Sequence, residues 1–262
     1  MNIRKRKMLS PMARKEERFR ILISQFNFWF EEAVSPRLGD LNKEIIVLRE
    51  KAQEIESEIR DYEENNIQND ENGRPSETYL DFFSELGGLD TEIHFFSEQQ
   101  LAIEEMKLVF LYKEFEIMMK ELITLSFPDA AVDELYKWDY VKTFFKGSGI
   151  LVGDIKNHKL INELRLVNNN IKHSNIIDEK VIKADILEFK HKENFDCESL
   201  SAFYARVRNA PVTFLKHLSE KLIEYLFVFD DDRIEKIASQ YEERMNKAAA
   251  AKLAETLIRK CT

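Results

Sequence analysis

Scarcity of glycine and proline is the sequence feature that most limits what this chain can fold into. Its 262 residues include 7 glycines and 5 prolines. A β-rich fold of this length requires many more turn residues, whereas long helices need few connections. The chain is also 44% hydrophobic and 33% charged, so it can bury a core and keep a solvated surface. We therefore predict an all-α fold, a helical bundle of about seven to nine helices.

Apolar runs and cysteines indicate the cellular compartment of the protein. No uninterrupted apolar run approaches the roughly 18–20 residues that cross a bilayer, and the N-terminus lacks the apolar segment of a signal peptide. The two cysteines, Cys197 and Cys261, have no CxxC spacing and are typical of reduced thiols in a cytosolic protein. We expect a cytoplasmic protein with no membrane-spanning segment.

Charge is distributed unevenly along the chain. The formal net charge is −9, which argues against a general nucleic-acid binder. Residues 1–20 nevertheless hold eight Lys and Arg against two Glu, a local net charge of +6. The basic N-terminal arm, residues 1–12, therefore has two interpretations: it contacts phosphates, or it is a solvated terminus that aids solubility.

A heptad pattern marks one helix of the N-terminal region, residues 13–90. Apolar residues alternate at spacings of four and three over three heptads: Leu41, Ile45, Leu48, Ala52, Ile55, Ile59 and Tyr62. This seam of helix 41–62 either packs within the chain as an antiparallel hairpin or pairs with a second copy. The next long helix is equally long and apolar on one face, which favours the hairpin.

Breaker residues set the other expected boundaries in the N-terminal half. We expect Pro36 to end a first helix that spans residues 13–34, and Gly87-Gly88 to end a short helix at 78–86. Residues 65–76 are rich in Asn, Asp, Gly and Pro and predict a loop. A long central helix follows to residue 126, with Phe95 and Met106 in its buried stripe.

The C-terminal half is expected to hold a helical core, residues 91–229, and a C-terminal helix within 230–262. Residues 181–189 are rich in β-branched side chains and predict a short strand or a packed loop. The remaining segments predict helices at 138–145, 159–173, 198–227 (interrupted or bent by Pro211) and 233–260.

The common metal and nucleotide motifs are absent from the sequence. There is no HExxH, no zinc spacing of Cys and His, and no Walker motif. One Glu-x-x-His pair, Glu188 to His191, falls in a segment without a helical pattern. The Gly147-Ser148-Gly149 turn lacks the Lys-Ser/Thr of a phosphate loop. We therefore expect no metal and no cofactor.

A polar cluster ends the helix at 159–173. The segment Leu164 to Ser174 reads LRLVNNNIKHS, with three consecutive asparagines and a histidine where a solvated helix usually carries Glu, Lys or Ala. This segment resembles the motif region of HEPN domains, helical domains of prokaryotic toxin–antitoxin and phage-defence systems. Their signature is Arg, a polar residue, three variable residues and His. The resemblance covers about residues 92–227 and implies a HEPN-like core.

The resemblance implies roles for individual residues, because active HEPN domains are dimeric, metal-independent endoribonucleases. His173 takes the position of the catalytic histidine, which acts as general acid or base, and Asn169 takes the polar position. Asn168 occupies the arginine position, where an amide cannot neutralise charge on the scissile phosphate. Arg165, two turns upstream, and the adjacent Lys172 are candidates to replace that arginine.

Two further arginines and a structural alternative remain open. Arg206 and Arg208 form a second basic patch, whose spacing to His217 does not match the motif, and are candidate phosphate-binding residues. The asparagine run has a structural interpretation as well, in which the amides cap the helix and bond the following loop. Two functions follow: an RNA-directed effector of toxin–antitoxin or phage-defence type, or a non-catalytic helical scaffold. Either is expected to form a homodimer or bind a protein partner from the same operon, with no membrane.

Overall fold

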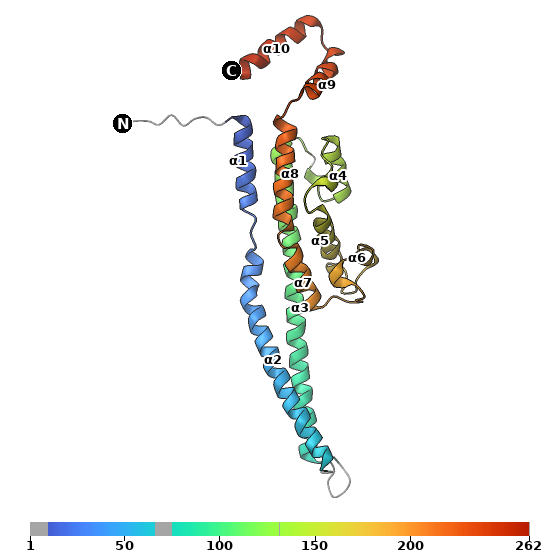
Figure 1. The fold of residues 1–262 in the computed structure, drawn as a ribbon. Coiled ribbons are helices and arrows are strands. Elements are labelled where there is room, and N and C mark those ends of the chain that lie inside the picture. The colour runs from blue at the N-terminus through green and yellow to red at the C-terminus, as the bar shows by residue number, and fades with distance from the viewer. Residues whose placement is uncertain (1–9, 66–74, 131, 262) are drawn as a thin grey trace, which may run out of the picture.

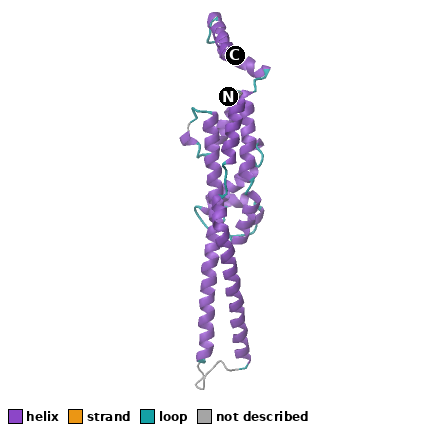
Figure 2. Ribbon diagram, turned by 90° about the vertical axis from the view of Figure 1, so that its left-hand side faces the viewer, coloured by secondary structure: helices purple, strands orange, loops and turns teal. Residues whose placement is uncertain are grey.

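The computed structural model describes residues 10–65, 75–130 and 132–261. The structure is 80% helical, and the described residues contain no β-strand (Figure 2), which confirms the predicted all-α helical bundle. Most of the basic arm at 1–12 and of the loop at 65–76 lies outside the described residues. In the part of the chain that is described, no helix is both long and apolar enough to cross a membrane.

The prediction that Pro36 ends the first helix is wrong. Helix α1 (Pro11–Ser24) is capped by Ser10, whose Oγ accepts a hydrogen bond from the Ala13 N–H, and ends before a short break. Helix α2 (Trp29–Glu64) then runs through Pro36 without interruption. Proline lacks an N–H, so the Glu32 carbonyl loses its helical partner. Glu32 and Pro36 are both exposed, and water can take the place of that bond.

The prediction that Gly87-Gly88 divides two helices is also wrong. Helix α3 (Glu77–Ser126) is continuous over 50 residues and includes both glycines. Two helical glycines cost about 2 kcal/mol relative to alanine. Ring contacts between Tyr62 of α2 and Tyr79 and Phe82 of α3 hold the start of α3 beside α2, so tertiary packing offsets the weak local propensity.

Helices α2 and α3 form an antiparallel hairpin that extends beyond the bundle as a two-helix stalk (Figure 1). Six seam positions are buried in it: Leu41, Ile45, Leu48, Ala52, Ile55 and Ile59. The heptad seam is therefore satisfied within one chain.

The core lies where the second half of α3 meets α1, α5 (His158–Ile171), α7 (Cys197–Val207) and α8 (Ala210–Phe227). Phe115 of α3 and Phe214 of α8, both fully buried, meet edge to face at its centre. Phe95 and Met106 lie outside it, because both are exposed on α3, contrary to the predicted stripe. The remaining elements of this region are α4 (Trp138–Gly147), α6 (Glu179–Lys183) and the short 3-10 turns Val132–Glu134, Val152–Asp154 and Leu187–Phe189.

Two expectations for the segments around the core are settled by the structure. Residues 181–189 form the end of α6 and a 3-10 turn, so of the two predicted alternatives the strand is wrong and the packed loop is nearer to the structure. The predicted helix 198–227 is interrupted, as expected, and Pro211 lies in the first turn of α8, where its missing N–H has no helical acceptor to lose.

The C-terminal segment is two helices, α9 (Asp231–Glu242) and α10 (Lys247–Cys261), instead of the single helix predicted at 233–260. They lie beyond the end of α8, away from the bundle (Figures 1 and 2). No α9 residue is buried among the described residues, and the apolar side chains of Ile234, Tyr241 and Leu257 on the two helices are exposed.

Candidate functional site

Polar groups meet accessible surface at the end of α5, where the sequence predicts a site, and in a groove between α1 and α8. Helix α5 begins after Asn157. The backbone of Asn157 has a positive φ of 63°, which turns the chain, and its side-chain amide makes no capping hydrogen bond to the helix. Leu164 and Val167 are fully buried against the core. The asparagines that follow them therefore divide between a buried and an exposed side of the same helix.

Asn170 holds the loop that follows α5. Its side chain is buried, and its Nδ2 donates to the carbonyl oxygens of Ser174 at 3.1 Å and Ile176 at 2.9 Å. Its Oδ1 accepts from the Asp178 N–H at 2.6 Å. One amide thus satisfies three backbone groups, which confirms the structural interpretation of the asparagine run for this residue.

Asn168, which the sequence resemblance aligns with the arginine of the motif, is completely buried. Its Nδ2 donates to Asn169 Oδ1 at 3.2 Å, and its Oδ1 has no hydrogen-bond partner within the described residues. A side chain in this place does not reach a phosphate on the surface of the protein.

Asn169, Lys172 and His173 lie exposed at the end of α5. The His173 backbone N–H donates to the Asn170 carbonyl at 2.9 Å. In the described part of the chain the His173 imidazole takes part in no hydrogen bond, and the Asn169 amide bonds to Asn168 instead. The structure places these groups together at an accessible helix end but does not orient the imidazole.

The arginines expected to assist this cluster have carboxylate or amide partners elsewhere. Arg165 donates from its Nε and a terminal nitrogen to Asn162 Oδ1, at 3.3 and 2.9 Å. Arg208 donates to Glu31 of α2 at 2.7 Å and lies over the Phe28 ring at 4.6 Å. These contacts fix the two side chains on their own and neighbouring helices.

Arg206 joins three elements through ion pairs with two glutamates. It makes two hydrogen bonds to Glu188, at 2.7 and 2.8 Å, and one to Glu163 of α5 at 2.7 Å. Burial pushes the pKa of Glu188 up, but hydrogen bonds and charge from Arg206 outweigh it, so this pKa lies below its usual range. The Arg206 side chain therefore links α7 to α5 and to the turn at Glu188.

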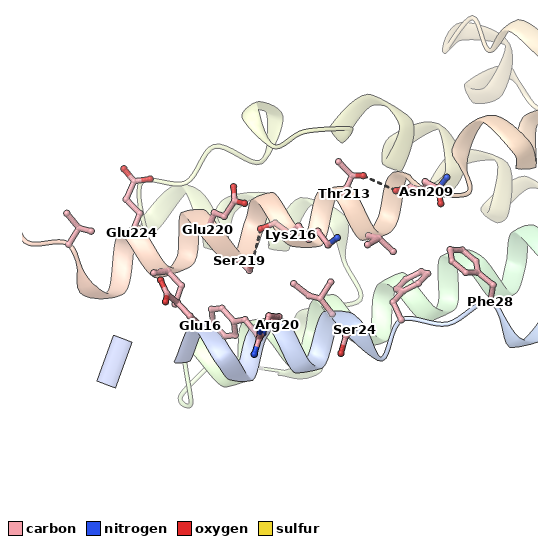
Figure 3. A pocket seen from close by; sticks show the side chains of 16 residues that line it. Glu16, Arg20, Ser24, Phe28, Asn209, Thr213, Lys216, Ser219, Glu220 and Glu224 are labelled. Carbon is pink, nitrogen blue, oxygen red and sulfur yellow. Dashed lines mark hydrogen bonds between the residues drawn. The ribbon is translucent and has the colours of Figure 1, made fainter. Parts of the chain in front are cut away.

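A groove with a volume of about 1030 Å³ lies between α1 and α8. The two helices run antiparallel, so that Glu16 lies opposite Glu224 and Phe28 opposite Asn209 (Figure 3). Its floor is apolar, with contributions from Phe19, Ile23, Phe26, Val212 and Ile223.

Charged side chains line the rims of this α1–α8 groove. Glu16, Glu220 and Glu224 gather at the end nearest α9, and one turn further along lie Arg20 and Lys216 (Figure 3). Sequence reasoning missed the groove. The signal was present as charged residues at helical spacing on α8, a pattern that by itself indicates only a solvated helix face.

No metal site accompanies either place. Within the described residues, no group of three His, Cys, Asp or Glu side chains is arranged to hold a metal ion. Comparison of the chain with known protein families, with curated proteins and with solved structures gave no match.

Proposed function

We propose that the protein is a non-catalytic helical docking protein whose α1–α8 groove holds an amphipathic helix of a partner chain. The groove itself is the observation that carries this proposal. It has about 1030 Å³ of space above an apolar floor, between the two antiparallel helices α1 and α8. An amphipathic helix binds such a groove by its apolar face, with anchors at positions i, i+3, i+4 and i+7.

The rim charges describe the chemistry of the occupant. Glu16, Glu220 and Glu224 at one end favour a basic side chain on the bound helix, and Arg20 with Lys216 favours an acidic one a turn away. Burial of the apolar face supplies most of the affinity, while the charges set direction and register. The polar rims also favour solubility of the protein while the groove is unoccupied.

Photo-cross-linking from the groove tests this function. Thr213 lines the groove, and Thr143 is exposed on α4; each threonine Oγ1 bonds the carbonyl four residues before it, at 3.1 and 2.9 Å. Replacement of Thr213 by p-benzoylphenylalanine is expected to give, after irradiation in cells, an adduct whose sequenced peptide is an amphipathic helix. The same replacement at Thr143 is the control. Equal adducts at both positions, or none at Thr213, would count against docking.

An RNA-directed effector of toxin–antitoxin or phage-defence type is the second candidate. The exposure of Asn169, Lys172 and His173 together at the end of α5 favours it. An accessible imidazole can act as general acid or base, and Lys172 supplies a cation beside it. Because Arg206 and Arg208 pair with glutamates, this proposal assigns phosphate binding to Lys172 or to a second copy of the chain.

RNA cleavage without metal tests the second candidate. The purified protein is incubated with tRNA and total RNA in chelator, and His173→Ala is compared with His94→Ala, which changes an exposed histidine on the stalk. We expect His173→Ala to abolish cleavage and His94→Ala to leave it intact, with both melting curves unchanged. Cleavage that survives His173→Ala would exclude this residue from the reaction.

A further inference from the structure

One face of α3 presents apolar side chains to solvent. Met106, Phe110 and Ile117 follow one another at spacings of four and seven residues, so they share one side of the helix. Met106 and Ile117 are 40% and 42% exposed, and Phe110 is half-buried. These three residues define the α3 face. An exposed apolar surface bordered by polar residues is typical of a protein–protein contact.

Aromatic rings from the start of α2 extend the α3 face. The Phe30 ring stacks on the Phe110 ring with 4.3 Å between centroids, and the Trp29 ring meets Phe110 edge to face at 5.1 Å. Trp29 is 50% exposed in spite of these contacts. Tryptophan is enriched in interfaces, because its ring buries a large apolar area. The α3 face therefore includes an exposed aromatic anchor.

Two opposite charges in the middle of the α3 face form no ion pair among the described residues. Lys113 lies one turn beyond Phe110, and its Nζ is 5.5 Å from the centre of the Phe110 ring. Glu114, the next residue, lines the same small pocket as Trp29 and Phe110. Burial and the charge of Glu121 raise the pKa of Glu114, and Lys113 offsets only part of this rise. A second cation beside the Glu114 carboxylate would therefore stabilise its charged form.

We infer that a second copy of the chain packs its α3 face against this one, with the two α3 helices antiparallel about a twofold axis. An axis that passes between Lys113 and Glu114 places Phe110 opposite Ile117 of the second copy. The same axis places Lys113 opposite Glu114 of the second copy. Every contact then occurs twice, as in any isologous dimer. The arrangement covers the apolar side chains and gives both charges a partner.

The positions of these residues identify the occupant as a second copy. A twofold antiparallel contact pairs residues that lie at equal distances on either side of the axis. Phe110 and Ile117 are centred on the same point of α3 as Lys113 and Glu114. The α3 face is therefore complementary to itself both in its apolar side chains and in its charges.

Light scattering on the full-length protein tests this dimer. The wild type is expected to have twice the 31.0 kDa mass of one chain at micromolar concentration. Lys113→Glu places a carboxylate opposite Glu114 of the second copy, and Glu114→Lys places an ammonium group opposite Lys113. Each variant alone is therefore expected to be monomeric. Ile46→Glu, a change on an exposed face of the stalk, is the control and is expected to remain dimeric.

Mixing the two monomeric variants shows whether the charges face each other. Each variant carries a single sign of charge at both positions, so an equimolar mixture is expected to form a heterodimer in which both pairs are restored. A monomeric wild type, a monomeric Ile46→Glu variant, a dimeric charge variant or a mixture that stays monomeric would overturn the contact. Neither Lys113 nor Glu114 lines the α1–α8 groove, so the photo-adduct at Thr213 tests docking separately.

Discussion

Ile55 lies on the face of α2 that packs against α3, and its replacement by glutamate tests whether the heptad seam is closed within one chain. The Ile55 side chain is 7% exposed. Burying an isoleucine contributes about 1.5–3 kcal/mol, and a carboxylate in the seam adds a desolvation cost. We therefore expect Ile55→Glu to lower the free energy of unfolding by at least about 2 kcal/mol.

Urea unfolding followed by circular dichroism, with the mass measured by light scattering, checks this value. Ile46→Glu is the matched control, because Ile46 is 55% exposed on the same helix and is expected to change the free energy by less than about 0.5 kcal/mol. A loss for Ile55→Glu no larger than the control, or a retained free energy with a lower oligomeric mass, would refute the intrachain seam.

Three further substitutions test other parts of the structure by the same unfolding measurement. Gly88→Ala is expected to stabilise by about 0.5–1 kcal/mol, because Gly88 is helical and an added Cβ meets no atom within 4 Å; no gain would indicate a helix break. Asn170→Ala should cost about 2–3 kcal/mol by leaving three backbone groups unpaired, whereas Asn175→Ala, at an exposed position of the same loop, should cost almost nothing; equal costs would contradict the described loop. Arg206→Met should cost about 1–2 kcal/mol at neutral pH, where it leaves the carboxylates of Glu188 and Glu163 without their arginine partner. The folded-state pKa of Glu188 is lowered, so the stabilisation from its pairing with Arg206 is present above the unfolded pKa of about 4.3 and is lost in acid. The free-energy cost of Arg206→Met should therefore be smaller in acid. A cost that does not change with pH would exclude the Arg206–Glu188 pair as the source of the stabilisation.

Helix content and the heptad seam were predictable because both depend on periodic burial. Leu41 to Ile59 repeat at a spacing that leaves one helical face apolar, and all six of those positions are buried. The breaks at Pro36 and Gly87-Gly88 were not predictable from local preference. Each costs a few kcal/mol at most, which a long seam of burial offsets.

The candidate site depended on contacts that sequence spacing does not contain. Asn168, Asn169 and Asn170 are chemically alike, yet the helix buries the first and third and exposes the second. Arg208 finds its partner Glu31 at a separation of 177 residues, so its availability for phosphate was not readable from its neighbours. The groove arises because α1 and α8 pack side by side and leave a space between their side chains. It therefore depends on two segments that lie far apart in the sequence.

Docking in the α1–α8 groove is tested most directly by the photo-adduct at Thr213 when the groove floor is changed. The adduct is measured in the unchanged protein, in Val212→Glu and in Ile46→Glu, with each variant's melting curve as a check on folding. Val212 lines the groove, whereas Ile46 lies on the stalk. We predict that the adduct is lost in Val212→Glu and retained in Ile46→Glu. An adduct of equal yield in all three proteins would contradict docking in the groove.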